Sequence, residues 1–420
     1  MSRKPSVGII FLTVFIDLVG FGIVVPLVQV YSRHLEASWL EIGIILAAFS
    51  AMQFVFSPIW GRLSDRIGRR PVLLLSTAGA TIAYALFAFG SGLESHRAAL
   101  GMILASRIFA GICGGNIGVA QAYIADISVP AERSKRMGLI GMAFGLGFIF
   151  GPVIGGLSLA HLGDTGPGWI ACSLCAVNFV LACWRLGESR QPGSEQAAKR
   201  PHIKQALHTL RQPQIGLLVV TFFLATFCFS CFESTLALLI SANFHLDILK
   251  DPKAASTVVY LYAFCGIIGA GVQGGAIGKL VKRLGEPKLI AASLLLTGLS
   301  MAPLPFITGK DPLSWAALFH ARGLPWLTLL LVLAVISVGS SLTRPPLFGM
   351  LSMLTPADEQ GETIGVAQSA GSLARIIGPI FAATVFGSHP AWPFLTCAVV
   401  AILTGLLVLK KLDAKTSASP

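Results

Sequence analysis

The stretch "GRLSDRIGRR" at residues 61–70 contains four arginines and one aspartate, and a long apolar run lies on each side of it. Such charge is rare in this chain, because 12% of its 420 residues are charged and 54% are hydrophobic. A soluble domain has roughly a quarter of its residues charged. The mean hydropathy of +0.77 likewise indicates a largely apolar chain. The sequence therefore excludes a soluble globular protein and predicts that this stretch is a short loop between two membrane-spanning helices.

Apolar runs longer than the roughly 18 residues that a helix needs to cross a bilayer recur along the chain. The first run continues to about Tyr31 and contains Asp17 and Pro26. It is too long for a signal peptide and is interpreted as the first spanning helix. The sequence thus predicts an all-α polytopic membrane protein with twelve transmembrane helices. Their centres are expected near residues 19, 50, 82, 111, 148, 178, 228, 266, 298, 338, 374 and 400.

The distribution of basic residues predicts the orientation. With the N-terminus inside, 22 of the 31 lysines and arginines fall in inside segments and six in outside loops. By the positive-inside rule, both termini are expected to be cytoplasmic. The net charge of +12 then reflects topology, and no nucleic-acid partner is expected. Short loops and the absence of an Asn-x-Ser/Thr sequon favour a bacterial inner (plasma) membrane over an organelle membrane.

The chain repeats itself. The pattern Gly-x-Leu-x-x-Arg-x-Gly at residues 61–68 recurs at 278–285, and Gly-Pro at 151–152 recurs at 378–379. Such internal similarity predicts two pseudo-symmetric six-helix halves, as in one large class of transporters. The expected organisation is an N-terminal half at 1–187, a polar cytoplasmic linker at 188–213 and a C-terminal half at 214–420.

Ionisable residues well inside the predicted spans are few: Asp17, Arg107, Glu233 and Arg375. Arg344, just before two prolines, is expected near a cytoplasmic helix end. A charge at mid-bilayer costs at least ~2.5–3.5 kcal/mol, so each of them needs an explanation. One interpretation is structural ion pairing within the bundle. The other is a proton-coupling site, in which burial favours the protonated carboxylate and a nearby guanidinium favours the charged one.

The eight cysteines all fall in predicted spans. The pairs Cys172–Cys175 and Cys228–Cys231 have the spacing of metal or redox sites, but each lies in an apolar helix and is interpreted as small apolar filler. No metal site and no cofactor are expected. Because no nucleophile–base set is found in the spans, an enzyme is not expected either.

Four motifs resemble the major facilitator superfamily. "GRLSDRIGRRP" (61–71) resembles its signature between helices 2 and 3, and the pattern at 104–111, which contains Arg107, is similar to its helix 4 signature. In that signature the arginine is linked with proton transfer. Residues 138–156 resemble the antiporter signature of helix 5, and "FIDLVGFGIVVP" (15–26) resembles helix 1 of drug:proton antiporters with twelve spans. The antiporter signature is a stripe of small residues that lets another helix approach closely. Its members here are Gly138, Gly147, Gly151, Pro152, Gly155 and Gly156.

From Phe11 to about Gly156 the chain resembles tetracycline-efflux-type exporters most, and "AYIADI" (122–127) belongs to that likeness. One departure stands out. Where those exporters carry an aspartate in a pattern like "GASLDY", this chain has "GATIAY", with Ala83 in the place of the acid. The resemblance therefore implies proton-coupled export, and it argues against tetracycline itself as the substrate.

The function expected from this resemblance is a proton-driven antiporter that exports a small amphipathic compound or drug by alternating access, working as a monomer. A proton-coupled symporter or facilitator that imports a nutrient is the alternative, and a transport-inactive receptor or scaffold is an alternative of another class. The resemblance places the substrate cavity between the halves, lined by helices 1, 4, 7 and 10. Candidate cavity residues, each of which can equally be a packing residue, are Phe21, Gln29, Asn116, Gln121, Phe229 and Gln273.

The opening stretch is interpreted as an inside marker and as a gate. Gly61 and Gly68 allow a tight turn, and Asp65 is placed to meet a helix N-terminus. The resemblance implies that this helix is the eleventh, with Arg70 and Asp126 completing a charge network. A latch of this kind would exist in one of two transport states. Its expected members are Gly61, Asp65, Arg66, Gly68, Arg69, Arg70 and Asp126.

Overall fold

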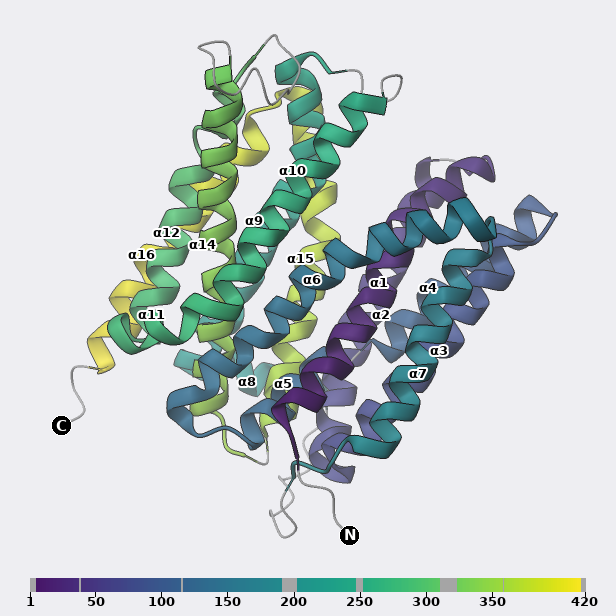
Figure 1. Ribbon diagram of the computed structural model, residues 1–420. Coiled ribbons are helices and arrows are strands. Elements are labelled where there is room, and N and C mark those ends of the chain that lie inside the picture. The colour runs from purple at the N-terminus through teal and green to yellow at the C-terminus, as the bar shows by residue number, and fades with distance from the viewer. Residues whose placement is uncertain are drawn as a thin grey trace. The chain divides into compact units, whose positions relative to one another are not determined.

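The computed structural model describes residues 5–37, 39–114, 116–190, 202–246, 252–309, 323–357 and 359–416. These residues form long helices joined by short turns (Figure 1). A helix satisfies every backbone N–H and C=O within its own segment, which is what a chain in hydrocarbon requires. The all-α prediction is therefore confirmed.

The described residues contain twelve helical segments that are long and apolar enough to cross a membrane. Every predicted centre falls within one of them, so the predicted spans are confirmed. Spans one to six are α1 (Val7–His34), α2 (Trp39–Ile67), α3 (Arg69–Ser91), α4 (His96–Cys113) followed by α5 (Asn116–Asp126), α6 (Pro130–Leu162) and α7 (Gly166–Arg185). Spans seven to twelve are α9 (Pro213–Phe244); α10 (Pro252–Gly271) with the π-helix η1 (Val272–Ala276) and α11 (Ile277–Leu284); α12 (Glu286–Met301), followed by the 3₁₀-turn η2 (Leu304–Phe306); α14 (Leu324–Leu354); α15 (Gln360–Ser388); and α16 (Trp392–Thr416).

The polar stretch predicted as a linker at 188–213 contains one further helix, α8 (His202–Arg211). Residues 191–201 of this stretch lie outside the described ranges.

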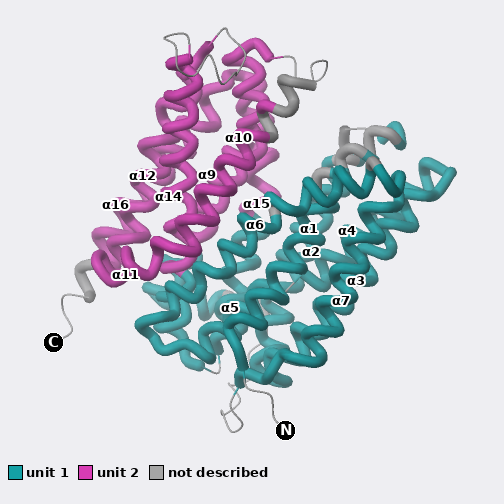
Figure 2. The backbone as a smooth tube through the Cα atoms, in the orientation of Figure 1, with its two compact units in different colours: residues 1–219, 348–373 teal, residues 220–347, 374–420 magenta. Residues whose placement is uncertain are grey.

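The chain divides into two compact units (Figure 2). Unit 1 consists of residues 1–219 and 348–373, and unit 2 of residues 220–347 and 374–420. The units are therefore not contiguous in sequence. The end of α14 and the first half of α15 belong to unit 1, although the internal repeat assigns both helices to the C-terminal half.

Within unit 1, glycines of α6 lie directly against α1. A Cβ atom added at Gly147 would come within 2.9 Å of Leu18, and one added at Gly151 within 2.6 Å of the Gly22 Cα. Gly155, one turn further on, faces Ile23. Small residues spaced by four let two helix backbones approach this closely. Of the other predicted members, Gly138 is buried, Pro152 is a half-buried residue inside the helix, and Gly156 is exposed with open space around it, outside the contact with α1.

Two prolines inside spans leave carbonyls that side chains of other elements satisfy. Pro58 has no N–H to donate to the Phe54 carbonyl one turn before it, and the Ser369 hydroxyl of α15 donates to that oxygen at 2.5 Å. In unit 2, Pro345 likewise frees the Ser341 carbonyl of α14. The Gln273 amide of η1 donates to that carbonyl at 3.3 Å. These donors explain how kink-forming residues are accommodated away from water.

Candidate functional site

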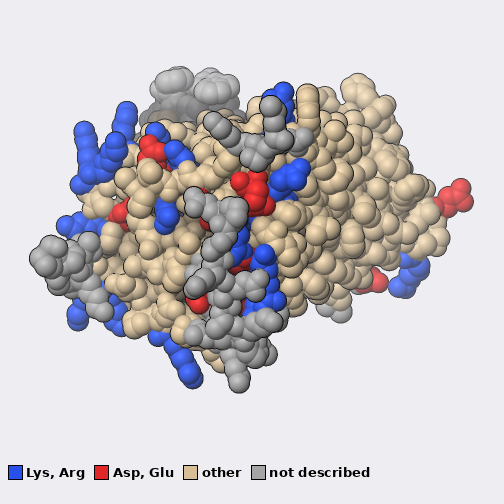
Figure 3. Space-filling view, turned by 90° about the horizontal axis from the view of Figure 1, so that it is seen from below, with Lys and Arg blue, Asp and Glu red and all other residues tan. Residues whose placement is uncertain are grey.

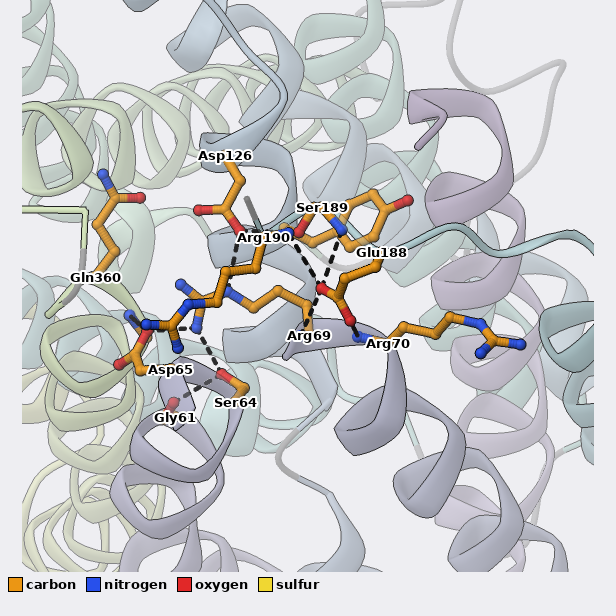
Figure 4. A network of polar contacts seen from close by, with 12 residues as sticks. Gly61, Ser64, Asp65, Arg69, Arg70, Asp126, Glu188, Ser189, Arg190 and Gln360 are labelled. Carbon is orange, nitrogen blue, oxygen red and sulfur yellow. Dashed lines mark hydrogen bonds and ion pairs between the residues drawn. The ribbon is translucent and has the colours of Figure 1, made fainter. Parts of the chain in front are cut away.

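A network of buried polar side chains surrounds the turn between α2 and α3 in unit 1 (Figure 4). Gly68 has φ +101°, a conformation that favours glycine, and it lets α3 begin one residue after α2 ends. Arg69, with 1% of its side chain exposed, lies at the centre of the network. Its Nη1 is 2.5 Å from Asp65 Oδ1 and 2.7 Å from Ser64 Oγ, and its Nε donates to Asp126 Oδ2 at 3.1 Å. One guanidinium therefore holds two carboxylates.

Asp65 also caps the eleventh span. The backbone N–H groups of Gly361 and Glu362, in the first turn of α15, donate to its Oδ1 and Oδ2 at 3.0 and 2.7 Å. A carboxylate at this position satisfies two orphan N–H groups and complements the helix dipole. A Cβ added at Gly361 would come within 2.6 Å of the Gly61 carbonyl oxygen, so the two backbones pass each other at two glycines. The expected contact between Asp65 and the eleventh span is present, and its role as a gate stays a prediction.

The prediction that Arg70 completes this network is wrong, because Arg69 does so. Successive residues of a helix point about 100° apart, and only the first of the two arginines faces Asp65 and Asp126. Arg70 instead donates to the carbonyls of Leu186 and Cys183, at the end of α7, at 2.8 and 3.0 Å.

Two further arginines of α2 lie close to Glu362. Arg66 is exposed and lies within electrostatic reach of Glu362. Arg62, which the sequence does not single out, forms an ion pair with Glu362 at 3.8 Å.

Glu188 is a member of the network that the sequence does not reveal. Its carboxylate accepts the backbone N–H groups of Arg69 and Arg70, at 2.9 and 3.1 Å, and so caps the start of α3. It also accepts the N–H of Ser189 at 3.0 Å, while the Ser189 hydroxyl donates to Asp126 Oδ2 at 2.8 Å. The first residues of the predicted linker are thereby fixed to the turn. An acid directly after the sixth span, at the same end of the bundle as the basic turn, is the signal that could have identified it.

A second polar cluster lies among the spans of unit 1. Arg107, 4% exposed, places its guanidinium carbon 4.7 Å from the ring centroid of Phe49 and 5.7 Å from that of Phe21. Its Nε has no hydrogen-bond partner among the described residues. Tyr84 lies within electrostatic reach of both Asp17 and Arg107. The structure therefore brings the predicted acid and arginine of this half around one tyrosine.

The thiol of Cys175 lies 3.8 Å from Asp17 Oδ1, so one of the eight cysteines contacts this cluster. The cysteines of the described chain are free thiols.

Unit 2 contains a third cluster. Arg375 of α15 lies within electrostatic reach of Glu233 of α9, as the sequence predicts for the second acid and arginine. The Tyr262 hydroxyl donates to the Glu233 backbone carbonyl at 2.6 Å. Arg344, predicted to lie near a cytoplasmic helix end, lies within α14 and within electrostatic reach of Arg375. Its guanidinium carbon is 5.3 Å from the centroid of Phe222, a residue of α9.

The candidate cavity residues have different environments. Phe21 packs against Phe49 beside Arg107, and Phe229 is 41% exposed. Gln121 is 2% exposed and accepts a hydrogen bond from Gln368 at 2.8 Å, and Gln273 donates to the Ser341 carbonyl of α14. The side chains of Gln29 and Asn116 lie outside the described residues.

Comparison with known proteins gives consistent matches along the whole chain. The sequence model of the Major Facilitator Superfamily matches residues 10–324 and 313–420. Tetracycline resistance protein, class E, of Escherichia coli is 32% identical over 400 residues, which is 93% of this chain and 90% of that protein. Multidrug resistance protein 2 of Bacillus subtilis (strain 168) is 28% identical over 425 residues, or 99% and 98% of the two chains. Among solved structures, the human organic anion transporter MFSD10 has the same fold, with a TM-score of 0.78 at 24% identity over 96% of this chain and 100% of that one.

Proposed function

Because the chain belongs to the Major Facilitator Superfamily of membrane transporters, we propose that it exports a small amphipathic compound in exchange for protons. Relatives named for tetracycline and multidrug resistance support export of a foreign compound. The fold supports alternating access, in which two states of the protein open to opposite sides of the membrane.

One observation carries the proposal: each unit has an acid and an arginine in the interior of its spans. Asp17 and Arg107 both lie within electrostatic reach of Tyr84 in unit 1, and Glu233 and Arg375 lie within electrostatic reach of each other in unit 2. Ionisable side chains at this depth are costly, and in membrane proteins they mark ion and substrate pathways. A guanidinium and a proton compete for such a carboxylate, and this competition suits it to proton coupling.

In the proposed cycle, Asp17 takes up a proton from the outside after the substrate has left. Neutralising Asp17 weakens its attraction for Arg107 and allows the protein to return to the inward-open state. Release of the proton to the cytoplasm restores the charge for the next cycle. Each proton that enters supplies ~2.3 kcal/mol per 100 mV of membrane potential, before any pH gradient is counted.

The network around Asp65 is the proposed latch of this cycle. It joins the end of α2 to the start of α15 through two backbone hydrogen bonds. In the other transport state these helix ends separate, so the contact sets the balance between the states. Arg69 and Asp126 hold Asp65 in position, and Gly61 provides the close approach.

The proposed setting is a bacterial inner membrane, with both termini cytoplasmic and the monomer as the working unit. Lysine and arginine side chains gather on the face of the molecule that Figure 3 shows. By the positive-inside rule, that face is the cytoplasmic one.

The test uses everted vesicles from a bacterial strain that lacks its own drug pumps. A fluorescent acridine dye reports the pH gradient, and tetracycline, ethidium and fluorescein are added as candidate substrates. An added substrate is expected to release protons from vesicles that contain the wild-type chain. Asp17→Asn should abolish this release, because an amide cannot exchange a proton.

Asp164→Asn is the matched control, since Asp164 is an exposed residue of a loop. It should leave the proton release unchanged. Undiminished release by Asp17→Asn would contradict the role of Asp17. A gradient-driven movement of substrate out of the everted vesicles would indicate import and contradict export.

A further inference from the structure

The helix α8 is too short to cross a bilayer, yet it exposes apolar side chains. Its 10 residues are about 15 Å long, roughly half the hydrocarbon thickness of a membrane. Leu207 and Leu210 are 48% and 43% exposed, and their spacing of three residues places them on one face of the helix. Thr209, on another side of the helix, is 1% exposed, so that side packs against the rest of the protein. The two leucines therefore form an exposed apolar face outside the spans.

This apolar face lies beside the start of the seventh span. The helix α9 begins two residues after α8 ends. The Gly216 N–H donates to the Gln212 carbonyl at 2.7 Å, and a Cβ atom added at Gly216 would collide with the Leu210 carbonyl oxygen. Leu210 is thus packed against the first turn of a spanning helix. Because residues 215–220 of that helix carry no polar side chain, α8 lies where the polar part of the chain meets the apolar part.

The charge around α8 is positive over a long stretch of chain. No aspartate or glutamate occurs between Glu195 and Glu233, whereas four lysines and arginines and two histidines do. Arg211, the last residue of α8, is exposed. Its spacing of four residues from Leu207 makes the two side chains neighbours on the helix surface. An apolar face flanked by basic residues is typical of helices that lie in the plane of the membrane surface.

We propose that α8 docks on the membrane surface, with Leu207 and Leu210 at the acyl-chain boundary and Arg211 at anionic phospholipid headgroups. The positive-inside rule accounts for basic residues near a span, but it does not account for exposed leucines beside them. The neighbouring segment of the chain, residues 191–201, contains no valine, isoleucine, leucine, methionine or aromatic residue that could cover these leucines. The adjoining bilayer supplies both an apolar layer and negative charge.

Docking of this kind has a consequence for the seventh span. An anionic surface attracts each basic residue near it, and this attraction falls off within a Debye length, which is about 10 Å at 0.1 M salt. Because α8 leads directly into α9, a docked α8 holds the start of the span at a fixed depth in the membrane. The inference depends neither on the direction of transport nor on proton coupling.

The test measures hydrogen exchange of the α8 amides in the full-length protein by mass spectrometry. The protein is placed in nanodiscs of phosphatidylcholine, or of phosphatidylcholine mixed equally with phosphatidylglycerol. Exchange should be at least about tenfold slower in the mixture, because each lysine or arginine near an anionic surface contributes about a fivefold gain in affinity and α8 contains two. At about 1 M salt, where the Debye length is about 3 Å, this difference should largely disappear.

Substitutions separate the charge from the apolar face. Arg211→Gln should reduce the difference between the two nanodiscs about fivefold, whereas Arg211→Lys, which keeps the charge, should leave it nearly unchanged. Leu207→Ser should speed exchange in the mixture by about fivefold, because a half-exposed leucine then loses its apolar contact with lipid. Arg283→Gln and Leu284→Ser are the matched controls, since they make the same changes at exposed positions of α11. Neither control should alter the exchange of α8.

Three outcomes would overturn the proposal. The first is equal exchange of wild-type α8 in the two nanodiscs at low salt. The second is a difference between the nanodiscs that Arg211→Gln leaves intact, because anionic lipid would then act elsewhere on the protein. The third is slow exchange of the same extent in both nanodiscs and in detergent micelles, because another part of the chain or a second copy would then cover the leucines.

Discussion

Replacement of Asp65 by asparagine tests the latch directly. The amide keeps one oxygen that can accept one of the two N–H groups at the start of α15, but the negative charge is lost. A charge at a partly buried helix N-terminus is worth up to ~2 kcal/mol, and a buried N–H left without its acceptor costs about 1–3 kcal/mol. Arg69 retains Asp126 as its partner, and this remaining ion pair limits the loss of stability of the joined state. We expect the joined state to lose about 2–3 kcal/mol, equivalent to a shift of roughly 30–150-fold in its equilibrium with the separated state.

The assay follows the exposure of a buried position near this contact. Ser352, at the end of α14, is 1% exposed, and its backbone carbonyl accepts hydrogen bonds from Arg133 and Gln360. Its own hydroxyl has no hydrogen-bond partner among the described residues, so Ser352→Cys is a mild reporter. Alkylation of this cysteine by a water-soluble maleimide, measured by mass spectrometry, requires the separated state. The rate should therefore rise by roughly 30-fold or more when Asp65→Asn is added to the reporter.

Substrate binding should be largely unchanged by Asp65→Asn, because the partners of Asp65 are Arg69 and the first turn of α15, and transport should be slower. Asp164→Asn in the same reporter background is the control for a lost carboxylate at an exposed loop. An alkylation rate equal to that of the control would refute the reasoning. So would a loss of substrate binding with no change in the rate.

Two further predictions concern helix packing and capping. Gly151→Leu should destabilise the protein by about 1–3 kcal/mol, because α1 leaves no room for a side chain at this position. Gly156→Leu, on the open side of the same helix, should change the stability very little. Thermal unfolding of the purified variants checks both. Glu188→Gln should cost about 1 kcal/mol, because the start of α3 loses its charged cap. Faster hydrogen exchange confined to the first turn of α3 is its expected signature, and exchange equal to wild type would contradict the cap.

The fold could be predicted because hydropathy depends on composition over long windows. Twelve runs of spanning length are visible without knowing how any helix is rotated about its axis, and all twelve are present in the described chain. The glycines of α6 that contact α1 could also be predicted from the sequence, because a spacing of four residues places them on one face of the helix. These features are periodic and local, and the sequence contains them in full.

The details of the clusters depend on helix rotation and on which segments meet, and the sequence specifies neither. Arg69 and Arg70 are adjacent and chemically identical, yet one bridges two carboxylates and the other binds carbonyls of α7. The prolines after Arg344 predict that a helix end lies nearby, but α14 continues through both of them to Leu354, and Arg344 lies within electrostatic reach of Arg375. Glu188 accepts a hydrogen bond from a residue more than a hundred positions away, and its position after the sixth span indicates the end of the bundle but not the partner.

The Ser369 hydroxyl donates a hydrogen bond to the Phe54 carbonyl, which Pro58 leaves without its helical donor. This bond makes positions 58 and 369 interdependent over evolution. Loss of the serine alone leaves a carbonyl in hydrocarbon without a donor, which costs about 1–3 kcal/mol. Loss of the proline alone restores the helix's own bond and leaves the hydroxyl to find another acceptor. A lineage that replaces Pro58 is then free to discard the hydroxyl, whereas one that keeps the proline must keep a donor on α15. Pro345 and Gln273 should follow the same rule in unit 2, so each proline and its donor should be gained or lost together.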